Sequence, residues 1–180
     1  MDIAVYGGSF SPVHQGHMAV ASGVLERGLA DEVWMMPCRR NPLKTENSVW
    51  KDSDRIEMLQ KAIEYAGDPR IRISTLELKM PSPSYTCNTF RKLMELYPDF
   101  RFRLIAGADS YLDFHKWRES EWLEATLRPI VYPRPGYEIR GLRPGWTLLE
   151  DATQVDISSS EIRKMMAENR PLGHLLPWIL

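Results

Sequence analysis

Two histidines stand three residues apart just after a pair of glycines, near the start of the chain. The string reads Gly7-Gly8-Ser9-Phe10-Ser11-Pro12-Val13-His14-Gln15-Gly16-His17. Glycines let a backbone turn tightly and approach a ligand closely. A helix that starts after such a turn presents unpaired N–H groups and the positive end of its dipole. His14 and His17 would share one face of its first turn, where imidazoles can donate hydrogen bonds. These features together predict a phosphate-binding loop.

Other sites built around this loop are less consistent with its residues. It lacks the Gly-Lys-Ser/Thr of a Walker loop and the GxGxxG of a dinucleotide site. It also lacks the HExxH spacing and third ligand of a zinc site, so we expect no metal held by protein side chains. One alternative stays open, in which one histidine caps or packs against the helix and the other is exposed.

The elements that must position this loop follow an alternation of strand and helix patterns. Strands are expected over 3–6, 32–36, 70–78, 102–106, 129–132 and 146–149, and helices over 15–28, 54–66, 86–96, 109–114, 120–125 and 159–168. Such alternation is typical of an α/β fold, a doubly wound, mainly parallel sheet with helices on both faces. Ligands of such sheets bind at the carboxyl ends of the strands, which here fall at Gly7-Gly8, Pro37, Gly107 and Pro133.

Composition narrows the class of protein. The 180 residues carry 23 Lys+Arg against 24 Asp+Glu, so the net charge of −1 argues against nucleic acid as a partner. We expect one domain, 1–180. The chain has no apolar run of membrane-spanning length, and its start does not resemble a signal peptide. Two cysteines without zinc spacing suit the cytoplasm. The sequence neither predicts nor excludes a homo-oligomer.

The glycine–histidine string resembles the GGSFxPxHxGH signature of the nucleotidyltransferases with an HxGH motif. About 140 residues later, Ile157-Ser158-Ser159-Ser160-Glu161-Ile162-Arg163 resembles their second signature, ISSTxIR. Within that superfamily the middle of the chain is similar to the nicotinate-nucleotide adenylyltransferases. The similar segments are Asn41-Pro42-Leu43-Lys44, Ser84-Tyr85-Thr86, Gly107-Ala108-Asp109, His115-Lys116-Trp117 and Pro133-Arg134-Pro135-Gly136-Tyr137. The resemblance covers essentially the whole chain.

The resemblance implies a Rossmann-like enzyme of NAD synthesis. Its reaction would join the AMP moiety of ATP to nicotinate mononucleotide, giving nicotinate adenine dinucleotide and pyrophosphate, with Mg²⁺ carried on the ATP phosphates. The attacking group is a phosphate monoester that is already largely dianionic near pH 7, so no general base is required. Catalysis can then rest on alignment and on charge stabilisation during in-line transfer.

On the ATP side, the resemblance implies that His14 and His17 hold the phosphates, with His17 nearest the reacting α-phosphoryl group. Arg163 and the helix start would grip the departing pyrophosphate, because a guanidinium fork and a helix dipole suit that charge. The other ATP-binding residues implied are Gly7, Gly8, Ser9, Phe10, Gly107, Asp109, Ile157, Ser158 and Ser159. Two simpler interpretations stay open, a plain N-cap at the serines with Glu161 in the first turn and a surface charge at Arg163.

On the acceptor side, Trp117 would stack on the pyridine ring and the Tyr85-Thr86 turn would receive the nicotinate carboxylate. A helix N-terminus prefers that anion to a neutral carboxamide. Asp109 would bind ribose hydroxyls, and Arg134 and Lys44 would meet acceptor phosphate or ribose. Trp117 as a core residue and Lys44 as a solvated one are the alternatives. The remaining tryptophans that we expect only to pack are Trp50, Trp122, Trp146 and Trp178.

Three positions depart from the family pattern. Ser11 stands where many members have Asp or Asn, Leu43 where many have His, and Ser160, which keeps the hydroxyl, where Thr is usual.

Two rival functions also remain: a sister enzyme acting on nicotinamide mononucleotide or phosphopantetheine, and a nucleotide-binding regulator without turnover. The acceptor residues favour nicotinate mononucleotide, and the intact ATP-side residues favour an enzyme. The basic segment 38–53 is expected to be a mobile substrate loop.

Overall fold

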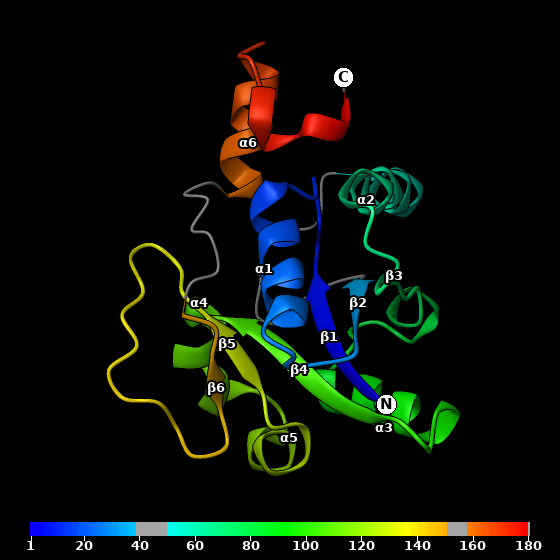
Figure 1. The fold of residues 1–180 in the computed structure, drawn as a ribbon, viewed down its shortest axis with the longest axis vertical. Helices are drawn as coiled ribbons and strands as arrows, with labels where there is room; N and C mark the ends of the chain where they lie inside the picture. Colours follow the sequence, from blue (N-terminus) through cyan, green and yellow to red (C-terminus); the bar gives the residue numbers. More distant parts are fainter. Residues whose placement is uncertain (39–49, 151–157, 180) are drawn as a thin grey trace.

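The structure, a computed structural model, describes residues 1–38, 50–150 and 158–179. Its centre is a six-stranded sheet (Figure 1) made of β1 (Asp2–Gly8), β2 (Glu32–Pro37), β3 (Ile71–Ile73), β4 (Arg101–Gly107), β5 (Ile130–Tyr132) and β6 (Thr147–Leu148). The strands lie in the order β3-β2-β1-β4-β5-β6, and every neighbouring pair is parallel. The expected doubly wound parallel sheet is confirmed.

The helices begin and end close to where local signals place them. They are α1 (Gln15–Glu26), α2 (Asp52–Ala66), α3 (Thr86–Leu96), α4 (Ala108–Leu112), α5 (Ser120–Leu127) and α6 (Ser159–Ala167), with 3₁₀ turns η1 (Glu77–Lys79), η2 (Phe114–Lys116), η3 (Gly173–Leu175) and η4 (Pro177–Ile179). Gly67 ends α2 in the left-handed conformation at φ 68°. Ser158 and Glu161 form a capping box at the start of α6.

Two expected elements differ from the structure. The extended run predicted over 70–78 is a strand only at Ile71–Ile73 and ends in the turn η1. This edge strand pairs with β2 through only three residues, and the chain leaves the sheet after them. The helix predicted over 109–114 ends at Leu112 and is followed by η2. Periodicity cannot place such breaks because they depend on what the next element packs against.

Helices cover both faces of the sheet, as expected. Successive strand residues point to opposite faces, and in β1 Ala4 and Tyr6 join one core cluster whereas Ile3 and Val5 join the other. The first cluster is completed by buried residues of α1, α2 and α6, and the second by residues of α3, α4 and α5. Figure 1 shows α1 lying across its face of the sheet, with α6 beyond the amino-terminal end of α1.

The strand order places a topological switch point between β1 and β4. Chain connections lead from β1 to β2 on one side, whereas β4 begins the other half of the sheet. In open parallel sheets, ligands bind in the crevice outside the carboxyl ends of the strands at such a point. Gly7-Gly8 and Gly107 stand at these two ends. Among the residues that the structure describes, no helix is long and apolar enough to cross a membrane.

Candidate active site

The two signature histidines stack on each other at the start of α1. His14 is the N-cap residue, just outside the helix rather than within its first turn, and His17 is the third helical residue. Their ring centroids are 3.8 Å apart. The backbone N–H of His14 donates to Nδ1 of His17 at 3.1 Å. A neutral imidazole that accepts at Nδ1 carries its proton on Nε2, so His17 is prepared to donate from Nε2.

His14 enters the site as a neutral group. Its residue is only 6% exposed, and burial lowers its pKa from 6.5 to about 4, with Arg134 lowering the pKa further and Glu161 opposing the shift. At pH 7, therefore, His14 supplies hydrogen bonding rather than charge. Its Nδ1 is buried, with no hydrogen-bond partner among the described residues.

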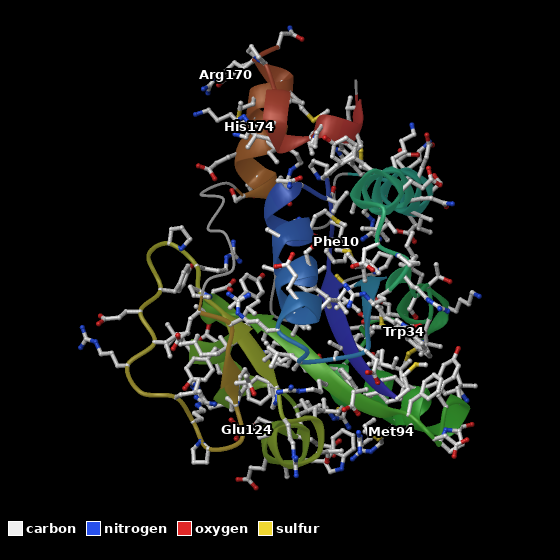
Figure 2. The ribbon with its side chains drawn as sticks, viewed as in Figure 1. Phe10, Trp34, Met94, Glu124, Arg170 and His174 are labelled. Carbon is white, nitrogen blue, oxygen red and sulfur yellow. The ribbon has the colours of Figure 1, made fainter. Side chains whose placement is uncertain are left out.

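Phe10 packs its ring against the ring of His17. It takes a positive φ of 44°, and its ring is buried beside α1 (Figure 2). The ring centroid of Phe10 lies 5.1 Å from that of His17 and 5.6 Å from that of Tyr6. The side chain thus packs behind a histidine, so any direct contact of Phe10 with ATP would come from its backbone. Gly7, Gly8 and Ser9 precede it at the end of β1, where Gly7 is exposed and the other two are half-buried.

The second signature folds onto the loop of the first. Nη1 of Arg163 donates to the carbonyl of Ser11 at 2.7 Å, and Oγ of Ser159 donates to the carbonyl of Pro12 at 2.9 Å. Nη2 of Arg163 contacts Oγ of Ser160 at 3.0 Å. Arg163 is therefore half-buried and anchored rather than a surface charge. Ser11, one of the departures from the family pattern, is buried at this junction.

The N-cap interpretation of the serine run is confirmed. Oγ of Ser158 accepts from the backbone N–H of Glu161 at 3.2 Å, and the Glu161 carboxylate accepts from the backbone N–H of Ser158 at 2.8 Å. These bonds to Ser158 hold the pKa of Glu161 below its usual value. Ile157 lies outside the described residues, as do Lys44, Leu43 and most of the segment 38–53.

Asp109 and Arg134 form an ion pair at the end of β4. Nη1 of Arg134 donates to Oδ2 of Asp109 at 2.9 Å. Oδ1 of Asp109 is buried and has no hydrogen-bond partner within the described part of the chain. A Cβ on Gly107 would lie 2.6 Å from that oxygen and 2.8 Å from Cδ of Arg134, so the pair closes over a position that only glycine fits. The sequence makes both residues candidates, but it does not predict that they pair.

Two acceptor-side candidates, Tyr85 and Trp117, pack on the opposite face of the sheet from the histidines. Tyr85 is the N-cap of α3 and Thr86 its first residue. Trp117 follows η2 and lies against Phe114, with ring centroids 5.0 Å apart. Cζ of Arg118 lies 5.0 Å from the centroid of the Tyr85 ring. Tyr85 and Trp117 both pack, partly buried, against the second core cluster, so Trp117 is neither fully core nor fully exposed.

Three further residues lie beside this site without having been candidates. The hydroxyl of Tyr6 donates to that of Tyr132 at 3.0 Å, and burial raises the pKa of both phenols. Arg55 is buried in α2 on the same stripe as Leu59 and Ala62. In the sequence, the signal for such a residue is an arginine at a position of the helix that otherwise carries apolar side chains. Of the tryptophans expected to pack, Trp146 and Trp178 are buried, Trp50 is half-buried, and half-buried Trp122 lies under Cζ of Arg91 at 4.4 Å.

Comparisons with known proteins show which family this chain resembles. Residues 5–165 match the family model described as cytidylyltransferase-like. The chain is 38% identical over 173 residues to a probable nicotinate-nucleotide adenylyltransferase of Bacteroides fragilis, covering 96% of this chain and 85% of that one. It is 35% identical over 175 residues to one of Bacillus licheniformis, covering 97% and 90%.

A solved structure has the same fold. The nicotinic acid mononucleotide adenylyltransferase of Plasmodium falciparum complexed with NaAD superposes with a TM-score of 0.82 at 25% identity, over 95% of this chain and 86% of that one. With two signatures joined at the switch point of a parallel sheet and with relatives matched over nearly their full length, the chain belongs to the nicotinate-nucleotide adenylyltransferases of the cytidylyltransferase-like family.

Proposed function

We propose that the protein transfers the adenylyl group of ATP to nicotinate mononucleotide and releases pyrophosphate. The observation that carries the proposal is the junction of the two signatures, in which Arg163 of α6 bonds the loop between β1 and the histidine pair. Cationic and N–H donors from distant segments thereby converge on one place at the switch point. The relatives named as nicotinate-nucleotide adenylyltransferases support the choice of acceptor.

The ATP phosphates would lie over the starts of α1 and α6. His17 would donate from Nε2 to the α-phosphoryl oxygen on which charge grows, and neutral His14 would donate beside it. Arg163 would hold the β- and γ-phosphates together with the first-turn N–H groups of α6, because the hydroxyls of Ser158 and Ser159 are already bonded within the protein. Gly7, Gly8 and Ser9 would give the backbone close access to the nucleotide.

The transfer itself requires few groups. A phosphate oxygen of nicotinate mononucleotide forms a bond to the α-phosphorus of ATP, and the bond from that phosphorus to the oxygen bridging to the β-phosphate breaks. Its electron pair leaves with pyrophosphate. The nucleophile is already an anion, so the residues of the site act by alignment and by stabilising charge rather than by removing a proton.

The acceptor would bind across the switch point, near β4 and α3. Trp117 would stack on the pyridine ring and the first-turn N–H groups at Tyr85-Thr86 would receive the carboxylate. Oδ1 of Asp109 has no partner among the described residues, which fits a ribose hydroxyl. Arg134 already neutralises the other carboxylate oxygen and would meet a phosphate or ribose next to it, and Lys44 is proposed to do the same.

Magnesium would enter with ATP. Residues 1–38, 50–150 and 158–179 contain no group of three or more His, Cys, Asp or Glu side chains that could hold a metal ion. The donor set around the histidines suits phosphate oxygens instead of a cation. Bound to the phosphates, Mg²⁺ would neutralise part of their charge.

We propose a setting as well as a reaction for the protein. Residues 1–180 would act as one nucleotidyltransferase domain with small-molecule substrates and without nucleic acid. The chain has only two cysteines, Cys38 and Cys87, which fits the reducing cytoplasm.

The test is initial pyrophosphate release by the purified protein with magnesium-ATP and, in parallel, nicotinate mononucleotide, nicotinamide mononucleotide and phosphopantetheine. We expect the nicotinate acceptor to have the highest kcat/KM. Preference for another acceptor would reassign the substrate within the same chemistry. ATP binding without turnover on any of the three acceptors would contradict the proposal and favour a nucleotide-binding regulator.

A further inference from the structure

Arg55 carries a buried positive charge beside the proposed site. It lies in the first turn of α2, and its side chain is 1% exposed. Across residues 1–38, 50–150 and 158–179 it is the one Lys, Arg, Asp or Glu residue that is buried. Removing a guanidinium from water is costly unless hydrogen bonds and opposite charge replace the water. Its contacts therefore indicate what the charge is retained for.

Those contacts join the ends of two strands. Nη1 of Arg55 donates to the carbonyl of Ser9 at 2.6 Å and to the carbonyl of Cys38 at 2.8 Å. Asp52, a half-exposed neighbour on α2, accepts from Nη2 at 2.5 Å. The backbone N–H of Cys38 donates to the carbonyl of Gly8, the residue before Ser9, at 2.8 Å. Arg55 thus continues the connection between β1 and β2 beyond their last residues.

The Ser9 carbonyl is connected to the histidine pair through the next residue in the chain. The next residue is Phe10, at the positive φ of 44°, whose ring lies 5.1 Å from that of His17. A shift of the Ser9 carbonyl would rotate the peptide that enters this strained residue. The ring that supports His17 would then move, and with it the Nε2 proton proposed to meet the α-phosphoryl group.

The positive charge of Arg55 also acts on a carboxylate near the proposed acceptor side. Glu77 of η1 is half-buried, and its removal from water raises its pKa, while the hydrogen bond from Ser84 and the charge of Arg55 lower that pKa. Oγ of Ser84 donates to the Glu77 carboxylate at 2.5 Å. Ser84 is itself buried and immediately precedes the Tyr85-Thr86 start of α3. The charge of Arg55 therefore acts on a carboxylate that anchors the proposed nicotinate-binding turn.

We propose that Arg55 is a positioning residue for adenylyl transfer, which holds the carboxyl ends of β1 and β2 so that Phe10 keeps His17 aligned on the α-phosphoryl group. The reaction that it serves rests on the function proposed above. The alignment itself does not, because it can be measured without turnover.

The kinetic test compares Arg55→Met and Arg55→Lys with a matched control, Arg103→Met. Arg103 also binds two backbone carbonyls, those of Leu29 and Arg128, but at the amino-terminal edge of the sheet. We expect Arg55→Met to lower kcat ~10²-fold and to change KM for ATP less than ~3-fold. Arg55→Lys should recover part of kcat, and it serves as the measurable variant if Arg55→Met does not fold. Arg103→Met should lower Tm with kcat within ~2-fold of the wild type.

A double-mutant cycle then tests the route through His17. If Arg55 acts by aligning His17, Arg55→Met should lower kcat much less in a His17→Ala background than in the wild type. Equal fold-losses in both backgrounds would overturn the proposal, as would falls in kcat that track Tm alike at Arg55 and Arg103.

The measurement without turnover uses ¹⁵N NMR of the histidine rings. Wild-type His17 should be protonated on Nε2, and folded Arg55→Met or Arg55→Lys should show a mixture of the two tautomers. An unchanged tautomer in both folded variants would overturn the positioning role. If the wild type does not use nicotinate mononucleotide but the tautomer still responds to Arg55, the proposed function fails and the positioning role stands.

Discussion

Individual side chains in this protein act through the neighbours that the fold supplies. His17 takes its tautomer from the backbone N–H of His14, and His14 loses its charge through burial and the nearby Arg134. Asp109 divides its two oxygens between an ion pair and a buried position with no protein partner among the described residues. The chemistry of each group is therefore set by a contact, and substitution of single residues can test it.

His17→Ala should lower kcat ~10²-fold or more, with a much smaller change in the affinity for ATP, because it removes a donor that acts mainly on the transition state. Steady-state kinetics and calorimetric ATP binding would measure the two effects. His115→Ala is the matched control, since His115 is exposed and has no proposed role. An unchanged kcat in His17→Ala would remove His17 from the mechanism.

His14 should make the fold sensitive to mild acid. Its pKa is about 4 in the folded protein, against an ordinary value of 6.5 for an exposed histidine. Between these values the unfolded state binds more protons, so the stability of the fold falls as pH falls. Through this residue the free energy of unfolding should be lower by about 2 kcal/mol at pH 5 than at pH 7. Urea unfolding of wild type and His14→Asn at both pH values would measure the difference. Identical pH dependences would contradict the buried, neutral state of His14.

The candidate residues lie at the ends of helices and strands rather than in their middles. The starts of α1, α3 and α6 and the ends of β1 and β4 all contribute residues to the candidate site. Because parallel strands end at one edge of the sheet, a helix that precedes or follows them presents its amino terminus there. Trp117 likewise lies at the end of a short element, the turn η2, where it is half-buried against Phe114.

Trp117→Ala should mainly raise KM for the pyridine nucleotide, since stacking on an aromatic ring is worth on the order of 1–3 kcal/mol. KM for ATP should change little. Trp122→Ala, a half-buried tryptophan of α5 under Arg91, provides the comparison and should leave both KM values near those of the wild type. A rise in KM for ATP alone in Trp117→Ala would mean that the two pockets were assigned the wrong way round.

At the level of the complete fold, the proposed ATP side of the site depends on contacts between the two ends of the chain. Arg163 and Ser159 bond the carbonyls of Ser11 and Pro12, which lie about 150 residues earlier in the sequence. The helix α6 is thereby held against the start of α1 (Figure 1). A change at Arg163 should therefore affect both pyrophosphate binding and the docking of α6.

Arg163→Ala should lower forward kcat ~10–10²-fold and, in the reverse reaction, raise KM for pyrophosphate without a matching rise for the dinucleotide. Loss of its bond to Ser11 should also lower the free energy of unfolding by ~1 kcal/mol. Arg163→Lys should keep charge but lose the fork and fall in between. Lys164→Ala, an exposed neighbouring cation, is the control. An unaltered KM for pyrophosphate would place the leaving group elsewhere.

Much of the fold could be read from local patterns. The alternation of strands and helices, the glycines at the ends of β1 and β4 and the capping signal at Ser158 depend on neighbouring residues, and the structure confirms them. The two signatures likewise indicated the family, since a motif is itself a local pattern. The strand order, the break before η1 and the end of α4 at Leu112 depend on packing and were not predictable in this way.

The sequence alone therefore suffices to propose residues for the phosphates and the acceptor, because residue type and spacing along a helix or strand are local properties. The protonation and pairing of these residues depend on the tertiary structure. Burial and the charge of Arg134 neutralise His14, Asp109 pairs with Arg134, and Arg55 binds two strand ends. Desolvation and charge pairing depend on distances through space between residues far apart in sequence, which no local pattern contains.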